Sequence, residues 1–585
     1  METPPEKKGP IVNCHTHVFT ADHVPPYIGK TFLPFFLPFL LTIPLVVHPA
    51  RWWFRYGPPR WKQNYLYRKM KQVYYLIQIS IDRYFILSAI AYVIGSLLTI
   101  HVFFVAYDWF SMLSAPSAAT PGIIETFRTW LIDHRLLYPM ESFWLNAMFL
   151  LVLILFFPAG RKLIFFIFKQ IWKFLAFFPG ETTREYFRRY MNIGRFSFYT
   201  EQSRIFGRLS GQYPAGTQFI LLPMDMEFMA AGKPPGDFYT QMQELAEIKD
   251  NHKKTALPFV FVDPRRITSD PNFFRYHSDA KTGKIILEPC FIKTYIEELG
   301  FSGFKIYPAL GYYPFDARLL PLWKYAAEND LPILTHCIRG TIFYRGIKAR
   351  EWDFHPVFKQ VMREGEYTKL LLPEIKNKDF CNNFTHPLNY LCLLEPSELM
   401  KVLARHDTPQ QVRDVFGYKE NKLSSDLKNL KICMGHFGGD DEWKRYFEQD
   451  RHDHSIQLSK HPHRGIDFFA TDGEPRPGKI EQLWKYTDWY SIICSMMLKY
   501  ENVYSDISYI VHSEEILPLL KKTLMAENEK LRSRVLFGTD FYVVRNHKSE
   551  KNMLADMLMA LTEEEFDCIA RKNPVRFLEN AVSQK

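Results

Sequence analysis

The sequence lacks the cysteine patterns that build disulfide scaffolds and zinc ribbons. Its 585 residues include eight cysteines but no C-x-x-C pair and no regular spacing; the cysteines stand at positions 14, 290, 337, 381, 392, 433, 494 and 568. Small disulfide-rich domains and structural zinc sites need cysteines at short, repeated intervals. The sequence therefore excludes those classes and predicts reduced thiols in an intracellular protein.

The sequence also has no basic repeat and no stacking motif of the kind that nucleic-acid-binding proteins use, although its formal net charge is +10. Much of the positive excess lies beside apolar segments. We therefore expect no nucleic-acid partner and expect anionic lipid as the counterpart of this charge. The first ten residues, METPPEKKGP, are too short and too polar for a secretion signal, so we expect no cleavage for export.

Apolar residues are concentrated between positions 30 and 180. Four apolar stretches occupy this region, at 31–47, 84–107, 143–157 and 163–178. The second is long enough to cross a bilayer and contains no acid, lysine or arginine, and the third is shorter. The first contains three prolines and the fourth has lysines inside an aromatic run, which are patterns typical of segments at a membrane surface.

The charges of the connecting loops distinguish a topology of two membrane spans from one of four. If both flanks of this region belong to one folded unit, they lie on one side of the membrane and the number of spans is even. Residues 48–83 carry eight bases and one acid, whereas residues 108–141 carry two bases and four acids. Because positive loops stay in the cytoplasm, we predict two transmembrane helices, at about 84–107 and 142–158. The alternative is a soluble hydrophobic lobe.

Eight short apolar runs outside this region end on polar residues, and helix-like stretches follow them. The runs are at 11–17, 218–225, 258–266, 302–310, 331–340, 431–439, 502–509 and 534–542. Eight such units predict an α/β fold, a closed (β/α)8 TIM barrel of parallel strands covered by helices. We expect the first strand in residues 1–29, an α-helical membrane insertion in 30–180 and the remaining barrel in 181–585.

Residue types that bind metals stand at the ends of these runs. In an extended strand His15 and His17 point to one face, so their ring nitrogens can converge on one ion. The later runs add Lys305, His336, His436 and Asp540. Imidazoles and a carboxylate suit zinc or another divalent ion that activates a water. Each later residue could instead be an ordinary capping, core or salt-bridge residue, but the coincidence at five strand ends favours one hydrolytic site.

This ordered set resembles the amidohydrolase superfamily of metal-dependent barrels. The segments ICMGHFGG, VLFGTDFY and RKNPVRFLEN resemble its amidohydrolase-related (amidohydrolase 2) branch in particular. The resemblance covers about residues 9–22 and 200–580 and does not cover the membrane region. It implies a metal-dependent hydrolase in which a metal-activated water attacks a carbonyl, ester or amide-type substrate, and it says nothing about which substrate.

The resemblance also implies roles for single residues. The implied metal ligands are His15, His17, His336 and Asp540. Asp540 would also take the proton of the attacking water, and His436 would bind a second ion or act on the substrate in a one-metal site. FKIYPAL resembles relatives whose lysine becomes a carbamate that bridges two metals, so Lys305 is either a carbamylated ligand or an ordinary cation. The resemblance leaves open whether the site holds one metal ion or two.

Arg265 and Arg339 follow the third and fifth runs and could clamp a substrate carboxylate, or they could be ordinary surface arginines.

We expect a small-molecule or amphiphilic substrate and a lipid bilayer as partners. The expected location is the cell (inner) membrane, multi-pass, with the barrel on the cytoplasmic side. Two other functions stay open: a metal-dependent non-oxidative decarboxylase or hydratase, and a catalytically inactive membrane scaffold. The sequence does not indicate the oligomeric state.

Overall fold

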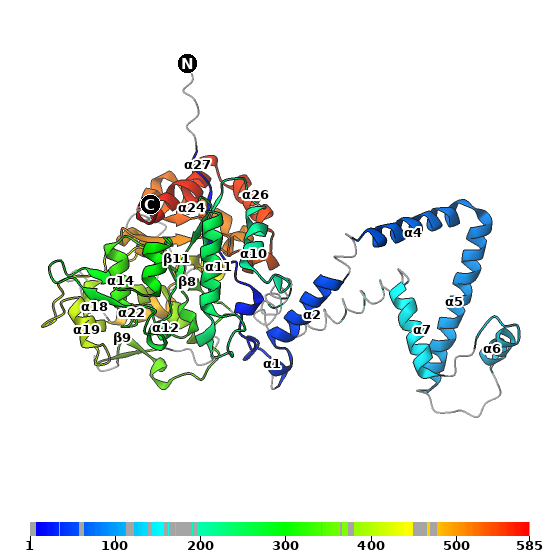
Figure 1. The fold of residues 1–585 in the computed structure, drawn as a ribbon. Coiled ribbons are helices and arrows are strands. Elements are labelled where there is room, and N and C mark those ends of the chain that lie inside the picture. Colours follow the sequence, from blue (N-terminus) through cyan, green and yellow to red (C-terminus); the bar gives the residue numbers. More distant parts are fainter. Residues whose placement is uncertain are drawn as a thin grey trace, which may run out of the picture. The chain divides into compact units, whose positions relative to one another are not determined.

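The computed structural model folds as two compact units (Figure 1). A barrel unit contains residues 1–51 and 185–585, and a helical unit contains residues 52–184. The structure describes residues 8–33, 36–57, 64–112, 122–138, 142–156, 196–340, 342–362, 366–372, 380–447, 465–468 and 477–583, with a few single positions between 157 and 195.

Parallel strands at eight positions form the centre of the barrel unit. They are β1 (Val12–Thr16), β2 (Gln218–Leu221), β3 (Ala256–Pro258) continued by β4 (Val260–Phe261), β7 (Phe304–Ile306), β8 (Ile333–Ile338), β11 (Ile432–Gly438), β12 (Val503–Asp506) and β13 (Val535–Leu536). They pair in this order in two sheets, β1 to β3 and β4 to β13.

Two sets of hydrogen bonds close these sheets into a barrel. The Phe259 amide, between β3 and β4, donates to the Leu221 carbonyl at 3.0 Å. On the other side the Cys14 amide donates to the Phe537 carbonyl at 2.8 Å, and Thr16 forms a parallel bridge with Phe541. The first strand therefore lies beside the last, and the predicted (β/α)8 barrel is confirmed.

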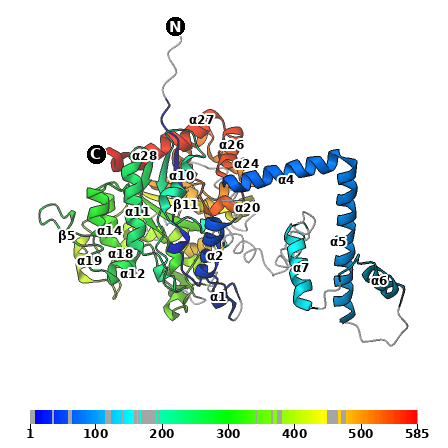
Figure 2. The ribbon, with the colours of Figure 1, turned by 45° about the vertical axis from the view of Figure 1, so that its right-hand side comes forward.

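Helices between successive strands and after the last strand cover the barrel (Figures 1 and 2). They are α10 (Gln202–Ser210), α11 (Phe238–Asn251), α12 (Pro264–Ser269), α13 (Phe291–Lys293), α14 (Leu320–Glu328), α16 (Asn382–Thr385), α17 (Leu391–Leu394), α18 (Pro396–Leu403), α19 (Gln410–Val415), α20 (Asp440–Phe447), α22 (Pro477–Tyr486), α23 (Trp489–Lys499), α24 (Leu517–Thr523), α25 (Glu529–Arg532), α26 (Glu550–Ala560), α27 (Glu563–Asp567) and α28 (Asn573–Ser583). In α11 the buried residues Met242, Leu245 and Ile248 recur every three residues, which places one apolar stripe against the strands.

Two antiparallel hairpins lie in the connections, where the apolar pattern did not predict strands. They are β5 (Tyr276–Ser278) with β6 (Ile285–Leu287), and β9 (Phe354–Val361) with β10 (Tyr367–Leu371). The second hairpin belongs to the long connection after β8. Exposed and buried residues mix along it, so it carries only a weak apolar pattern.

The helical unit contains α4 (Tyr65–Arg83), α5 (Phe85–Met112), α6 (Ile123–Asp133) and α7 (Phe143–Phe156). The preceding α1 (Leu37–Leu40) lies in the barrel unit, and α2 (Ile43–Tyr56) crosses the boundary between the units. Among the described residues one stretch, Phe85–Asp108, is long and apolar enough to cross a membrane, and 11% of its most apolar window is buried.

Only part of the other predicted membrane segments can be compared with the structure. The predicted span at 142–158 is helical over the 14 residues of α7, and positions 157 and 158 lie outside the described residues. Most of the apolar stretch at 163–178 also lies outside them. The two-span membrane insertion therefore stays a prediction.

Close packing of the barrel strands generates a stability prediction. A Cβ atom at Gly303, just before β7, would clash with the Pro332 carbonyl oxygen and lie 2.9 Å from the Phe259 ring. We expect Gly303→Ala to lower the free energy of unfolding by about 1–3 kcal/mol, measured by denaturant titration with circular dichroism.

The matched control is Gly207→Ala in α10, where a Cβ would meet nothing within 4 Å. Because alanine favours helix, this control should be neutral or more stable by up to about 1 kcal/mol. Equal stability of Gly303→Ala and the wild type would contradict the close strand packing.

Candidate metal centre

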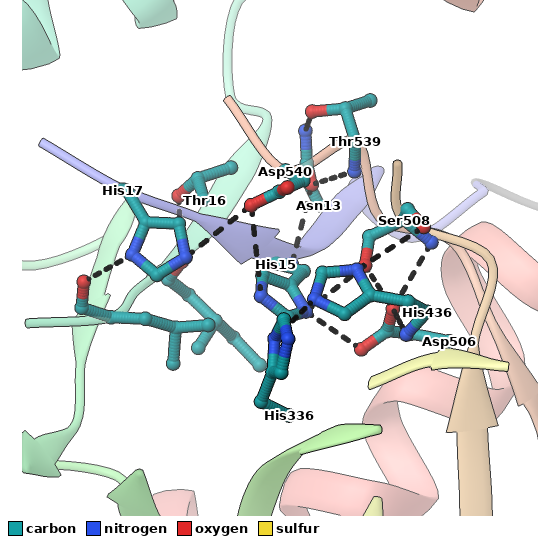
Figure 3. Close-up of polar contacts among 12 residues, drawn as sticks. Asn13, His15, Thr16, His17, His336, His436, Asp506, Ser508, Thr539 and Asp540 are labelled. Atoms are coloured by element: carbon teal, nitrogen blue, oxygen red, sulfur yellow. Dashed lines mark hydrogen bonds and ion pairs between the residues drawn. The ribbon is translucent and has the colours of Figure 1, made fainter. Parts of the chain in front are cut away.

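Three side chains from the first and last strands meet at the carboxyl ends of the barrel strands (Figure 3). His15 lies on β1, His17 directly follows it, and Asp540 follows β13. The Oδ1 atom of Asp540 is 3.3 Å from Nε2 of His17 and 3.9 Å from Nε2 of His15. One donor atom from each of the three lies within 4.8 Å of the other two, a spacing at which all three can hold one ion.

Hydrogen bonds on the far side of each ring decide which nitrogen faces this centre. Nδ1 of His17 is 2.8 Å from the Leu222 carbonyl, and Nδ1 of His15 is 2.9 Å from the Asp506 carboxylate. Carbonyls and carboxylates only accept, so Nδ1 carries the hydrogen and each Nε2 presents a lone pair in the neutral ring. Two lone pairs and the Asp540 carboxylate therefore converge, an arrangement that a cation between them stabilises.

A second group of polar side chains continues from this centre (Figure 3). His436, on β11, has its Nε2 atom 3.0 Å from Nδ1 of His336, which lies on β8. The Ser508 hydroxyl lies 2.9 Å from Nδ1 of His436 and 3.0 Å from Nδ1 of His15. The Asp506 carboxylate accepts from the Ser508 hydroxyl and from the His436 amide. Asp506 and Ser508 therefore connect the rings of His15 and His436.

A cavity of about 20 Å³ lies beside these groups, which is room for about one water molecule. Its polar walls are His17, His336, His436 and Asp540, and its aromatic walls are Phe19, Tyr307 and Tyr509. The aromatic walls keep bulk water out, so charges in the cavity interact more strongly than they would in water.

Three residues that line the cavity have an unusual backbone. His436, Tyr509 and Asp540 have φ values of 68°, 63° and 62°, in the left-handed region that non-glycine residues rarely adopt. Such conformations cost about 1–3 kcal/mol each and persist where surrounding contacts impose them. The Asp540 amide, for example, donates to the His15 carbonyl at 2.8 Å. The strained backbone directs these side chains into the cavity.

Burial keeps the imidazoles of His15 and His436 neutral. It lowers the pKa of His15 well below its ordinary value, and the charge of Lys305 contributes to the same shift. Burial also lowers the pKa of His436 to about 3. Neutral imidazoles are the form that binds metal, so these rings are ready to act as ligands at neutral pH.

Lys305, on β7, is fully buried, and its Nζ atom has no hydrogen-bond partner among the described residues. Burial lowers its pKa to about 8, and the nearby carboxylates of Asp506 and Asp540 oppose the shift. The amine is therefore easier to deprotonate than an exposed lysine, as carbamate formation requires. Its role as a bridging ligand stays a prediction.

The two arginines predicted to clamp a substrate have partners within the protein. Arg265 pairs with Asp263 at 2.6 Å and lies over the Tyr312 ring. Arg339 is 3.4 Å from Glu442 and lies over Trp489. Neither arginine is among the described residues that line the cavity. A substrate carboxylate would have to draw each side chain from its partner, and the clamp stays a prediction.

Sequence reasoning missed Asp506 and Ser508, although a signal existed. Both stand at the end of the seventh apolar run, NVYSDISY, where the rule used for the other strand ends applies equally. It also missed a network behind Asp540, for which no sequence signal exists. There Glu550 accepts from the hydroxyls of Tyr213 at 2.6 Å and Thr539 at 2.8 Å.

The buried Glu550 generates a pH prediction. Burial raises its pKa to about 7 from an ordinary value of 4.5. An acid with a higher pKa when folded takes up protons on folding between these two values. Glu550 therefore makes the free energy of unfolding fall as pH rises from about 4.5 to about 7. We therefore expect the free energy of unfolding of Glu550→Gln, minus that of the wild type, to increase by about 2–3 kcal/mol between pH 5 and pH 7.5 in urea titrations.

Comparison with the variant is necessary because the buried histidines act in the opposite direction. Their lowered pKa values make stability rise with pH below about 6.5. The histidines contribute equally in both proteins, so their effect cancels when the two free energies of unfolding are subtracted. If this difference in free energy does not change with pH, Glu550 is ionised at neutral pH in the folded protein.

Comparisons with known proteins give one family match and several distant structural similarities. Residues 473–579 match the amidohydrolase family model, and no curated protein matches the chain. The chain is similar to 2,6-dihydroxybenzoate decarboxylase from Rhizobium, at 15% identity and a TM-score of 0.34 over 69% of this chain and 93% of that one. It is also similar to 5-carboxyvanillate decarboxylase from Sphingomonas paucimobilis, at 13% identity and a TM-score of 0.33, over 66% of this chain and 85% of that one.

A dihydroxybenzoic acid decarboxylase from Polaromonas with bound manganese is similar at 16% identity and a TM-score of 0.34, over 69% of this chain and 91% of that one. The family match covers β12 and β13 and contains both Asp506 and Asp540. The predicted resemblance is therefore confirmed: residues 473–579, which hold the last two barrel strands, match the amidohydrolase family.

Proposed function

We propose that this chain is a metal-dependent hydrolase of the amidohydrolase type. One observation carries the proposal. The Nε2 lone pairs of His15 and His17 converge with the Asp540 carboxylate in a buried site, and Nε2 of His15 has no hydrogen-bond partner among the described residues. Without a cation or proton between them, these groups repel each other at 3.3–3.9 Å.

The donors fit a divalent ion. Two imidazole nitrogens and one carboxylate oxygen are the ligands that catalytic zinc prefers, and we propose zinc on that basis. The Asp506 carboxylate accepts from His15, a contact that orients a ligating imidazole and raises its basicity. Nε2 of His436 and Nδ1 of His336 are 3.0 Å apart, and these two rings, with Lys305, would hold a second ion if there is one.

When bound, the ion would polarise a substrate carbonyl and lower the pKa of a water at the site. The protein supplies the remaining steps. Asp540 lines the cavity and accepts the proton of the attacking water, then passes it to the leaving group. His436, oriented by the Ser508 hydroxyl, contacts the substrate oxygen from the other wall. Phe19 and Tyr307 exclude bulk water during the reaction.

We further propose that the helical unit anchors the enzyme in the cell (inner) membrane by two spans, with the barrel in the cytoplasm. The apolar stretch Phe85–Asp108 and the excess of bases in residues 48–83 support this. A membrane-anchored hydrolase would meet amphiphilic ester or amide substrates at the bilayer surface.

Metal quantification on the purified full chain tests the proposal. We expect one or two divalent ions per wild-type chain, and at least about a tenfold loss of affinity in His15→Ala and Asp540→Ala because each removes a ligand. His277→Ala, which removes an exposed histidine outside the site, is the matched control and should keep the metal. A wild type that neither contains nor rebinds a divalent ion would refute the proposal.

Product analysis distinguishes hydrolysis from decarboxylation. A hydrolase incorporates one oxygen from ¹⁸O-labelled water into the acid product of an ester or amide substrate. We expect Asp540→Asn to lower kcat by about 10²–10⁴-fold, because it loses the proton acceptor. Release of carbon dioxide from carboxylate substrates, without oxygen incorporation, would show a lyase instead.

A further inference from the structure

The helix α4 exposes an apolar stripe that a soluble helix would bury. It begins after Asn64, whose side chain caps it by accepting from the Leu66 amide at 3.0 Å. None of its 19 residues is buried. Leu66, Met70, Val73 and Ile77 recur at intervals of three and four and are 53–70% exposed. Such a stripe on a protein surface marks an interaction site.

Basic residues lie beside and opposite this stripe. At helical periodicity Lys69 lies at one edge of the stripe and Lys71 lies on the polar side with Gln78, and the only acid of the helix, Asp82, stands in its last turn. Nζ of Lys69 lies over the Tyr65 ring at 5.2 Å, and Nζ of Lys71 over the Tyr75 ring at 5.7 Å. Lysines at the edge of an apolar stripe and on the polar face opposite it, with tyrosines beside them, are typical of a helix in a bilayer interface.

The next helix fixes how α4 would meet a membrane. Tyr84 has an extended backbone that ends α4, and the apolar α5 follows at once. Figures 1 and 2 both show α4 joining the first end of α5 at an angle. A groove of about 480 Å³ lies between them, and Leu76, Ile77 and Ile81 of α4 and Leu87, Ile90 and Ile94 of α5 contribute to its apolar lining. A helix in the membrane plane that turns into a span has this geometry.

We propose that α4 lies in the headgroup region of an anionic phospholipid leaflet, with its apolar stripe toward the acyl chains and Lys69 and Lys71 at the phosphates. The occupant of the groove between α4 and α5 is then a lipid acyl chain. The charges favour lipid over a protein partner, because seven more bases than acids in residues 48–83 complement anionic headgroups. This inference rests on the proposed membrane anchoring.

Site-specific labels on the full chain test this placement. The eight native cysteines are buried, so a single added cysteine on the surface can be labelled with an environment-sensitive fluorophore. The labelled positions are Ile77→Cys on the apolar stripe, Gln78→Cys on the polar side and Ile94→Cys in α5. Each protein is reconstituted in vesicles of phosphatidylcholine alone or with about one third phosphatidylglycerol, and iodide quenching is measured.

With phosphatidylglycerol present we expect quenching at Ile77→Cys to be at least about threefold weaker than at Gln78→Cys, because only the first label faces the acyl chains. Ile94→Cys should be protected in both vesicles. Protection at Ile94→Cys with equal, strong quenching at the two α4 positions would overturn this inference and leave the anchoring intact. Strong quenching at all three positions would refute the anchoring itself.

Removing the charges of Lys69 and Lys71 tests the lipid preference. In the labelled Ile77→Cys chain, Lys69→Gln with Lys71→Gln should abolish the extra protection that phosphatidylglycerol gives, because each base contributes attraction to an anionic surface. The matched control, Lys253→Gln with Lys281→Gln, removes two exposed lysines of the barrel unit and should keep that protection. Protection of Ile77→Cys that needs no phosphatidylglycerol and rises with the protein-to-lipid ratio would show that a second copy of the chain covers α4 instead.

Discussion

The candidate centre depends on the closure of the parallel sheet between its first and last strands. The Cys14 amide bonds to the Phe537 carbonyl, and the Asp540 amide bonds to the His15 carbonyl, both at 2.8 Å. These bonds hold the imidazoles of β1 beside a carboxylate from the far end of the chain. Behind them Asn13 contacts the hydroxyls of Tyr213 and Thr539, at 2.9 Å each. Any change that opens this seam separates the proposed metal ligands.

Burial gives the centre its chemistry. The imidazoles of His15 and His436 are neutral because charging them in the interior is costly, and the neutral form is the one that binds metal. The same burial lowers the pKa of Lys305 to about 8. Asp506 has a different role. Its carboxylate accepts hydrogen bonds from the ring of His15 and the backbone amide of His436, and so orients both residues. A cation would therefore enter a site whose ligand atoms are already oriented toward it.

The helical unit interrupts the barrel between two strands that are neighbours in space. Val12 of β1 pairs with Gln218 of β2, although the whole helical unit lies between them in the chain. The entropic cost of closing a loop grows only with the logarithm of its length, and an insertion that folds by itself adds less than a flexible one. The barrel can therefore carry a large insertion here and still bring His15 and His17 to its mouth.

The periodic features could be predicted from local sequence patterns: eight apolar runs, their polar ends and the apolar helices, because burial in parallel strands and helices imposes these patterns locally. From them followed the barrel and the placement of His15, His17, His336, His436 and Asp540 at strand ends. Long-range contacts in the folded chain set which ring nitrogens face the centre, bring Asp506 and Ser508 into it, and pair Arg265 and Arg339 with acids. Those outcomes depend on contacts between residues far apart in the chain, which leave no periodic trace in the sequence.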